Sequence, residues 1–162
     1  MKKIAAFICL WVIIGCASWK SIPQVAKNSN PYFDVSMCSE SFWTFNLKVK
    51  NKTDKNIEID WNRTYFIDVS GNTNGRFTFG EENYWEDRNM VPPPTIIFPN
   101  TVMEKNLYPV ANRYWKRSWQ WSYMDLGKNG ILLTALVDGK IIEERMYLKF
   151  IVDTKSENKN EK

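Results

Sequence analysis

The chain has 162 residues and a formal net charge of +4, with 22 Lys and Arg residues against 18 Asp and Glu residues. Lys2 and Lys3 supply two of these excess charges, so the remaining chain is too nearly neutral to predict nucleic-acid binding. It contains no histidine, which excludes serine- and cysteine-type catalytic triads with their usual base.

The first sixteen residues predict a secretory signal that ends at a lipid attachment site. Lys2 and Lys3 precede an apolar run over residues 4–14, and the small residue Gly15 stands before Cys16. The run is about half the roughly 20 apolar residues that a membrane-spanning helix needs, so a retained span is disfavoured. Ordinary secretory cleavage elsewhere gives no reason for Cys16. We expect residues 1–15 to be the signal peptide.

The tetrad Ile13-Ile14-Gly15-Cys16 resembles the bacterial lipoprotein box. This resemblance implies that a dedicated peptidase cuts before Cys16, which then carries acyl chains such as palmitate. Stable anchoring requires more than one lipid signal, and several chains provide it. Ala17, not aspartate, follows Cys16. In a bacterium with two membranes this implies sorting to the outer membrane, with the domain facing the periplasm or exposed at the surface.

The polar segments at the two ends of the mature chain bound one expected domain. Residues 17–30 show no usable periodicity, so residues 16–30 are predicted to be a lipidated cysteine and flexible tether. Residues 153–162 are almost entirely Lys, Glu, Asn and Ser, which predicts a disordered tail. A single folded domain is expected over residues 31–152, a length that buries its own core.

The first half of this domain predicts two hairpins. Apolar and polar residues alternate over 42–50 and 56–61, on either side of a polar turn, and we expect these segments to pair. Trp61 is expected in the core. Residues 65–69 and 76–79 flank a connection rich in Gly and Asn, which predicts a second hairpin.

The second half of the domain also predicts short strands between turns. Residues 80–94 contain four acidic residues and three consecutive prolines, which predicts an exposed loop leading into an edge strand. Residues 95–98 and 101–103 surround a turn. Residues 131–137 and 140–152 are joined by Asp138-Gly139, a strong signal for a two-residue hairpin. Short strands between turn clusters are typical of an all-β sandwich or barrel.

Residues 45–62 (FNLKVKNKTDKNIEIDWN) resemble a group of small, largely uncharacterised bacterial lipoproteins. The likeness continues through Phe66-Ile67-Asp68, Gly71, the proline-containing segment 92–99 and the last hairpin, and covers roughly residues 42–152. More distantly, the strand–turn–strand unit is similar to the water-stress and late-embryogenesis type domain. The resemblance implies an immunoglobulin-like antiparallel β-sandwich. A fold alone implies no activity.

Catalysis or metal binding has weak support in the sequence. Asp60 and Asp68 are the best acidic pair for a hydrolase, but solvated strand-end residues explain them as well. Cys38 lacks an activating base and is expected to be a buried small apolar residue. The acids of residues 80–94 lack the spacing of a calcium loop. We expect no enzyme activity, no metal and no cofactor.

Aromatic residues are concentrated between Tyr108 and Tyr123, and they divide into two groups. Trp119, Trp121 and Tyr123 alternate with polar residues, which predicts a strand with its rings in the core. Residues 114–117 do not alternate, which indicates a loop with at least one exposed ring. Flat rings beside hydrogen-bonding groups suit sugar faces or a membrane interface.

The exposed aromatic residues predict a binding site at one end of the sandwich, where such folds place binding loops. Its expected members are Tyr84, Trp85, Tyr114, Trp115 and Arg117. The expected function is a lipid-anchored cell-envelope protein that acts as a protein-interaction or envelope-assembly module. The alternative is a glycan-binding lipoprotein that holds peptidoglycan or surface polysaccharide on these rings. The expected partners are therefore a membrane, through the lipid, and another envelope protein or a glycan.

Overall fold

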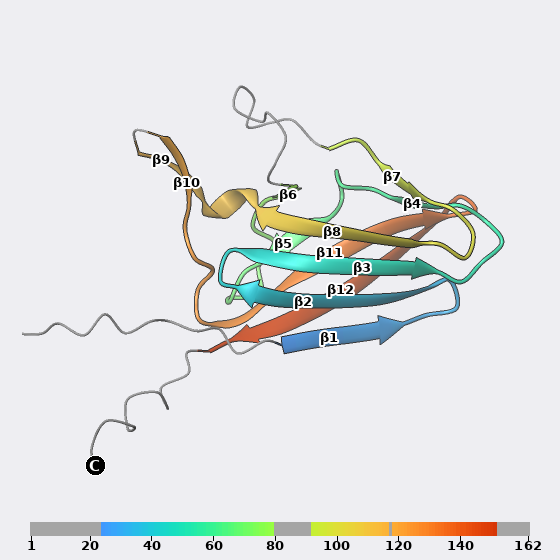
Figure 1. The fold of residues 1–162 in the computed structure, drawn as a ribbon, viewed down its shortest axis with the longest axis horizontal. Helices are drawn as coiled ribbons and strands as arrows, with labels where there is room; N and C mark the ends of the chain where they lie inside the picture. The colour runs from blue at the N-terminus through green and yellow to red at the C-terminus, as the bar shows by residue number, and fades with distance from the viewer. Residues whose placement is uncertain (1–23, 80–91, 117, 152–162) are drawn as a thin grey trace, which may run out of the picture.

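The computed structural model describes residues 24–79, 92–116 and 118–151. Two antiparallel sheets pack face to face (Figure 1), which confirms the predicted all-β sandwich. The first sheet contains, in spatial order, β1 (Gln24–Ser29), β2 (Phe33–Ser41), β3 (Thr44–Asn51), β8 (Val102–Pro109) and β6 (Phe77–Thr78). The second contains β12 (Lys140–Phe150), β11 (Gly127–Val137), β4 (Ile57–Ile59) and β7 (Thr95–Ile97), with β5 (Tyr65–Ile67) also paired to β11. A short helix, η1 (Val110–Asn112), leads into the hairpin of β9 (Arg113–Lys116) and β10 (Ser118–Trp121).

The strand order is immunoglobulin-like. β3 leads across to β4 in the second sheet, β4 pairs with β7, and β7 leads back to β8, which pairs with β3. The orders β12–β11–β4 and β2–β3–β8 reproduce the G–F–C and A–B–E arrangements of such sandwiches. The signal peptide expected before the domain lies outside the described residues.

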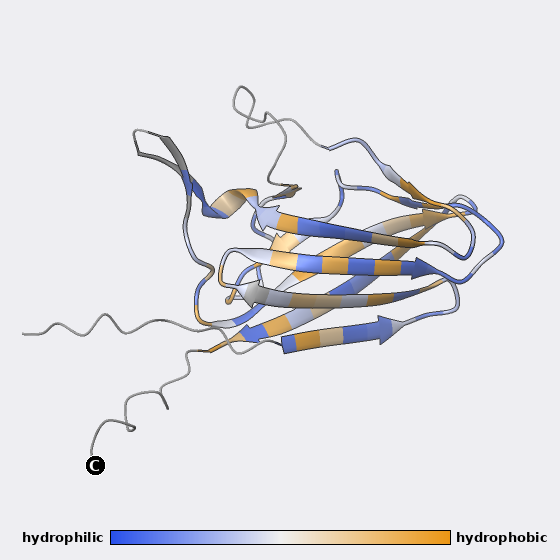
Figure 2. Ribbon diagram, viewed as in Figure 1, coloured by the Kyte–Doolittle hydropathy of each residue, from blue (hydrophilic) through white to orange (hydrophobic). Residues whose placement is uncertain are grey.

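The core lies between the two sheets and follows the alternation of the strands, visible along β3 in Figure 2. Phe45, Leu47 and Val49 of β3 are fully buried. Ile131, Leu133 and Ala135 of β11 are fully buried as well. Trp61 is 2% exposed, and its indole Nε1 donates to Thr95 Oγ1 at 2.9 Å. The prediction that Trp61 belongs to the core is therefore confirmed.

The first predicted hairpin is wrong. β3 pairs with β2 and β8, while β4 pairs with β11 and β7 in the other sheet. The polar segment between β3 and β4 is a crossover between sheets. Alternation marks which side of each strand is buried, but it is the same whether two strands pair side by side or face each other across a core.

The second predicted hairpin is wrong in its second strand. β5 pairs with β11, and β6 pairs with β8 of the first sheet. The connection between them does fold back on β5, because Asn74 N donates to Phe66 O at 2.7 Å, Phe66 N donates to Gly75 O at 3.0 Å, and Ile67 lies opposite Thr73. Phe66 and Phe77 face each other edge-on, with centroids 6.2 Å apart. Placing the strands in opposite sheets buries both rings against each other.

The predicted tether is wrong over residues 24–29, which form β1. This edge strand pairs with β2 from Gln24 opposite Ser39 to Ser29 opposite Asp34. Apolar and polar residues do not alternate along β1, because only Ala26 of this strand packs against the core. Main-chain pairing with β2 therefore holds the strand in place. The folded domain therefore begins before the expected residue 31.

The last hairpin is confirmed. β11 and β12 pair in continuous register from Val137 opposite Lys140 to Gly127 opposite Phe150. Asp138 and Gly139 have φ values of 50° and 73°, as the favoured two-residue hairpin turn requires. Turn chemistry that is local in sequence therefore identified this pairing correctly.

Candidate binding surfaces at the two ends of the sandwich

The predicted binding residues are only partly within the described chain. Tyr84, Trp85 and Arg117 lie outside it. Tyr114 and Trp115 are on β9, opposite Gln120 and Trp119 of β10, so the loop expected there is a strand instead. Main-chain pairing with β10 extends the segment without needing an apolar alternation. The β9–β10 hairpin projects from one end of the sandwich (Figure 1).

The expectation that Tyr123 belongs to the core is wrong, because its side chain is 65% exposed. β10 ends at Trp121, and Met124 N then donates to Phe42 O at 2.6 Å, which turns the backbone. Met124 takes the buried position instead. The side chains of Trp119 and Trp121 lie outside the described part of the structure.

Tyr123 stacks on Trp43, which no sequence pattern singled out. The two ring centroids are 5.1 Å apart with an interplanar angle of 14°, and Trp43 is 41% exposed. Trp43 lies in the short turn between β2 and β3, next to the buried Phe42. The sequence did contain a signal for this exposed ring, because Phe42 and Trp43 are adjacent. Consecutive side chains tend to point to opposite sides, so one of the two rings could be expected at the surface.

The Trp43–Tyr123 pair is the surface end of a continuous series of aromatic contacts from the core. Neighbouring ring centroids lie 5.8 to 6.1 Å apart along Phe45, Phe150, Phe42 and Tyr123. These tilted and edge-on contacts are favourable arrangements for aromatic rings. The buried rings therefore hold the exposed pair in a fixed orientation.

This end of the molecule exposes further apolar surface. A hollow of about 300 Å³ beside the pair is lined by Phe42, Tyr123, Met124, Asp125 and Leu126. Leu126, Val25 and Val69 are also exposed. Val69 belongs to this end because its side chain lies next to Gly127, where β11 begins.

The opposite end carries an apolar row across the outer face of the second sheet. Ile96 lies opposite Glu58, Glu58 opposite Leu136, and Leu136 opposite Ile141. Ile96 and Ile141 are exposed and Leu136 is half-buried. We call Ile96, Leu136 and Ile141 the distal row. Phe98, also exposed, lies beside it at the end of β7.

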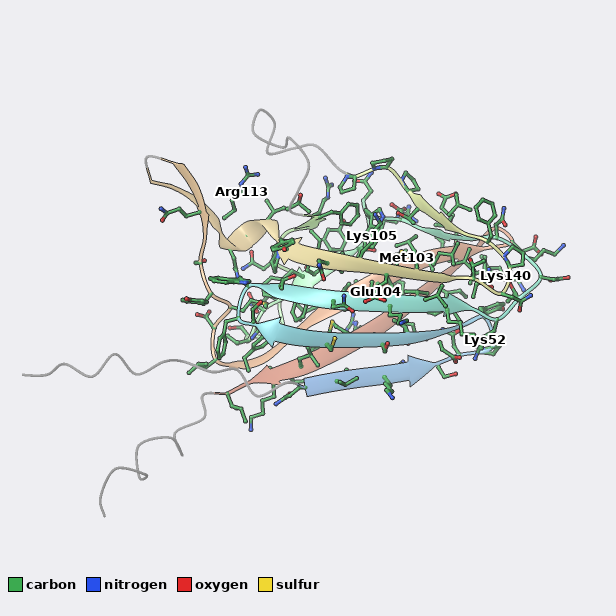
Figure 3. The ribbon with its side chains drawn as sticks, viewed as in Figure 1. Lys52, Met103, Glu104, Lys105, Arg113 and Lys140 are labelled. Carbon is green, nitrogen blue, oxygen red and sulfur yellow. The ribbon has the colours of Figure 1, made fainter. Side chains whose placement is uncertain are left out.

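The outer face of the first sheet forms a third surface, an open trough of about 660 Å³. Its lining residues are Lys27, Asn28, Ser29, Asp34, Val35, Ser36, Lys48, Lys50 and Val102. Lys27, Ser36, Lys48 and Glu104 stand opposite one another across four strands. Figure 3 shows Glu104 on β8 in the middle of this face and Lys52 toward the distal end.

Two carboxylates on this face are held in the ionised form. A hydrogen bond from Ser29 Oγ (2.6 Å) and the nearby Lys52 ammonium (2.9 Å) lower the pKa of Asp34. The Asn46 amide (3.1 Å) and the Lys48 ammonium (3.3 Å) lower the pKa of Glu104.

The structure does not bring Asp60 and Asp68 together. Each carboxylate accepts a hydrogen bond at 2.9 Å from the main-chain N–H two residues further along, as in a local turn. Asp60 N donates to Thr134 O, whereas Asp68 follows Ile67, which lies opposite Gly130. These β11 positions place the two residues on the order of 15 Å apart along the strand. Among the described residues, no group of three His, Cys, Asp or Glu is arranged to hold a metal ion.

Cys38 is half-buried, not fully buried as expected. Its neighbour Met37 occupies the inward position on β2, so Cys38 points to the outer face, with its Sγ 3.8 Å from Asn46 Oδ1.

No family model matches the chain, and no curated protein and no solved structure shows significant similarity to it. The resemblance to small bacterial lipoproteins therefore stays a prediction. Over the described residues, the structure contains no helix long and apolar enough to cross a membrane.

Proposed function

We propose that this protein is a lipid-anchored protein of the bacterial cell envelope whose sandwich domain binds another envelope protein. The tetrad ending at Cys16 supports the anchor and the envelope location, and Ala17 after it favours the outer membrane. The distal row is the observation that carries the interaction. The proposal includes no catalysis, because Asp60 and Asp68 each bind the main chain of their own turn.

The distal row has the properties of a protein-binding surface. Ile141 and the half-buried Leu136 lie side by side, Ile96 lies beyond Glu58 in the same line, and the exposed Lys140 stands at the adjoining turn. Figure 3 shows Lys140 at this end. Apolar centres with polar borders are typical of protein interfaces.

The position of the row relative to the anchor also favours this function. Gln24, the start of β1, lies opposite Ser39 near the Trp43–Tyr123 end, whereas the distal row lies near the Asp138-Gly139 turn. The eleven residues of β11 separate these ends by about 36 Å. A domain tethered through Cys16 therefore presents the row to partners away from its own attachment point.

Site-specific photo-crosslinking in the native bacterium tests this function. A crosslinking amino acid at Ile141 is expected to capture a discrete envelope protein, and the same amino acid at Lys27 is not. Ile96→Asp in the same chain should abolish capture from position 141. The matched change Val102→Asp, at a similarly exposed residue of the other sheet, should leave it unchanged. Equal capture from both positions, or insensitivity to Ile96→Asp, would contradict the proposal.

A glycan is the second candidate ligand, and the trough on the first sheet is the observation that favours it. Hydroxyl and ammonium groups from Ser36, Lys27 and Lys50 suit the hydroxyls and acidic groups of envelope polysaccharide. Titration with soluble peptidoglycan fragments tests it. Chemical-shift changes that are confined to the trough and lost in Lys27→Ala would support this ligand, and their absence across the panel would eliminate it.

A further inference from the structure

The end of the sandwich nearest the lipid attachment site is the end that carries the Trp43–Tyr123 pair. Gln24 Oε1 accepts a hydrogen bond from Lys149 N at 2.7 Å, and the next residue, Phe150, packs against Phe42. β1 therefore begins beside the turn that carries Trp43. Figure 1 shows the start of β1, the β2–β3 turn and the β9–β10 hairpin at the same end.

The length of chain before β1 limits how far this end can lie from the lipid. Seven residues separate Cys16 from Gln24. Even fully extended, these eight steps span at most about 28 Å. The distal end lies a further 36 Å or so away, the length of β11. The Trp43–Tyr123 end is thus the one that a short tether brings to the bilayer.

The chemistry of this end fits the interface between lipid and water. Trp and Tyr combine an apolar ring with a polar group and are enriched at the headgroup level of membranes. Leu126, Val25 and Val69 add exposed apolar surface around them. The buried Phe42 already holds the Trp43–Tyr123 pair in place. Binding of the pair to a membrane therefore costs little side-chain conformational entropy.

Charged residues near this end are compatible with a lipid surface. Lys128 and Lys149 are exposed and lie directly opposite each other on β11 and β12, where they can meet lipid phosphates. Asp125 is exposed beside the hollow. Its carboxylate can stay in water at the edge of the contact, as charged side chains near headgroups do.

We propose that the Trp43–Tyr123 end of the sandwich rests on the bilayer that holds the lipid, with both rings at headgroup level. This inference rests on the proposed acylation of Cys16, and it gives the domain a second membrane contact and a fixed orientation. The distal row then faces away from the membrane. A glycan on the same rings is the competing occupant.

The test uses the full mature protein, purified with its native N-terminus and labelled throughout with 5-fluorotryptophan. It is bound to phosphatidylethanolamine–phosphatidylglycerol vesicles that contain a nitroxide-headgroup lipid. The fluorine resonance of Trp43 is assigned by its loss in Trp43→Phe. Trp61, which is 2% exposed, is the internal control. We expect the nitroxide to broaden the Trp43 resonance several-fold more than the Trp61 resonance. A fluorinated phenylalanine at Phe98, at the opposite end, should remain sharp.

Three results would overturn the inference, and they separate its failure from that of the proposed function. Equal broadening of Trp43 and Trp61 in protein that sediments with the vesicles would refute the orientation but leave the anchor intact. A shift of the Trp43 resonance with soluble peptidoglycan fragments, without broadening by vesicles, would identify a glycan as the occupant. A mature protein without acyl chains that stays in the supernatant would refute both the anchor and the orientation that depends on it.

Discussion

Asn51 is the buried side chain that fixes the crossover between the sheets. It is fully buried, and its Nδ2 donates to the carbonyls of Lys55, Ile97 and Phe98 at 2.7 to 3.2 Å. Its Oδ1 accepts from Thr53 N at 2.8 Å. One amide thereby holds both the turn after β3 and the turn before β8, so this polar segment satisfies backbone groups of the crossover through a side chain.

Asn51→Leu is expected to lower the free energy of unfolding by about 2–4 kcal/mol, because it removes the side-chain donor to the buried Ile97 carbonyl and to the Lys55 and Phe98 carbonyls, together with the acceptor of Thr53 N. Urea unfolding followed by tryptophan fluorescence measures this loss. The same change at the exposed Asn106 should cost less than about 0.5 kcal/mol. Similar losses at the two positions would show that the buried amide does not hold the crossover.

The same substitution at Trp61 and at Trp43 gives a direct comparison, because one ring is in the core and the other is at the surface. Trp61→Ala should cost about 3–5 kcal/mol, as removal of a buried aromatic side chain does. Trp43→Ala should cost under about 1.5 kcal/mol, the scale of one aromatic contact. Unfolding midpoints of the two variants give the comparison, and a negligible shift for Trp61→Ala would place that ring outside the core.

At the scale of elements, alternation located the strands, but it did not determine their partners. The segments around Phe45 and Ile57 were correctly predicted as strands with one buried face. Their assignment to opposite sheets depends on contacts distant in sequence, such as those of Asn51 with Ile97. β11 and β12 were paired correctly because Asp138-Gly139 determines that turn locally. β1 was missed because an edge strand needs no apolar alternation.

A chain that begins at residue 31 should be less stable than one that begins at residue 20, because the shorter chain lacks β1. It loses the strand pairing with β2 and the hydrogen bonds that Asn28 and Asn30 donate to the Glu144 carboxylate at 2.5 and 2.7 Å. We expect a loss of about 2–4 kcal/mol in denaturant unfolding. Deletion of residues 153–162 is the control and should change nothing. Equal stability of the two N-terminal truncations would show that residues 24–30 do not stabilise the domain and belong to the tether.

At the scale of the whole molecule, the exposed aromatic pair was not predicted. The sequence indicated exposed aromatic residues at one end, but Trp43 and Tyr123 were not among the residues that it named, and the side chains of those named lie outside the described part of the structure. Alternation placed Tyr123 inside, because it gives no sign that β10 stops at Trp121. The distal row was not predicted, because Ile96, Leu136 and Ile141 become neighbours only through the pairing of four strands.

The pH dependence of stability is also a property of the whole molecule. Asp34 and Glu104 have pKa values lowered in the folded state, so both stabilise it when ionised. That contribution is complete above the unfolded-state pKa values near 4 and is lost as the pH falls through the lower folded-state values. Without histidine, we expect stability to be flat from pH 6 to 8. Urea unfolding should show a decline below pH 4 that is smaller in Glu104→Gln, and an identical decline in the variant would contradict this assignment.

Lipid attachment to Cys16 separates an anchored envelope protein from a secreted one, and mass spectrometry of the mature N-terminus measures it. We expect the first residue to be Cys16 carrying acyl chains, in protein recovered from the membrane pellet. Cys16→Ser should move the protein to the soluble fraction or leave it unprocessed. A mature chain that begins elsewhere, an unmodified Cys16, or a serine variant that pellets like the parent would show that the protein is not lipid-anchored.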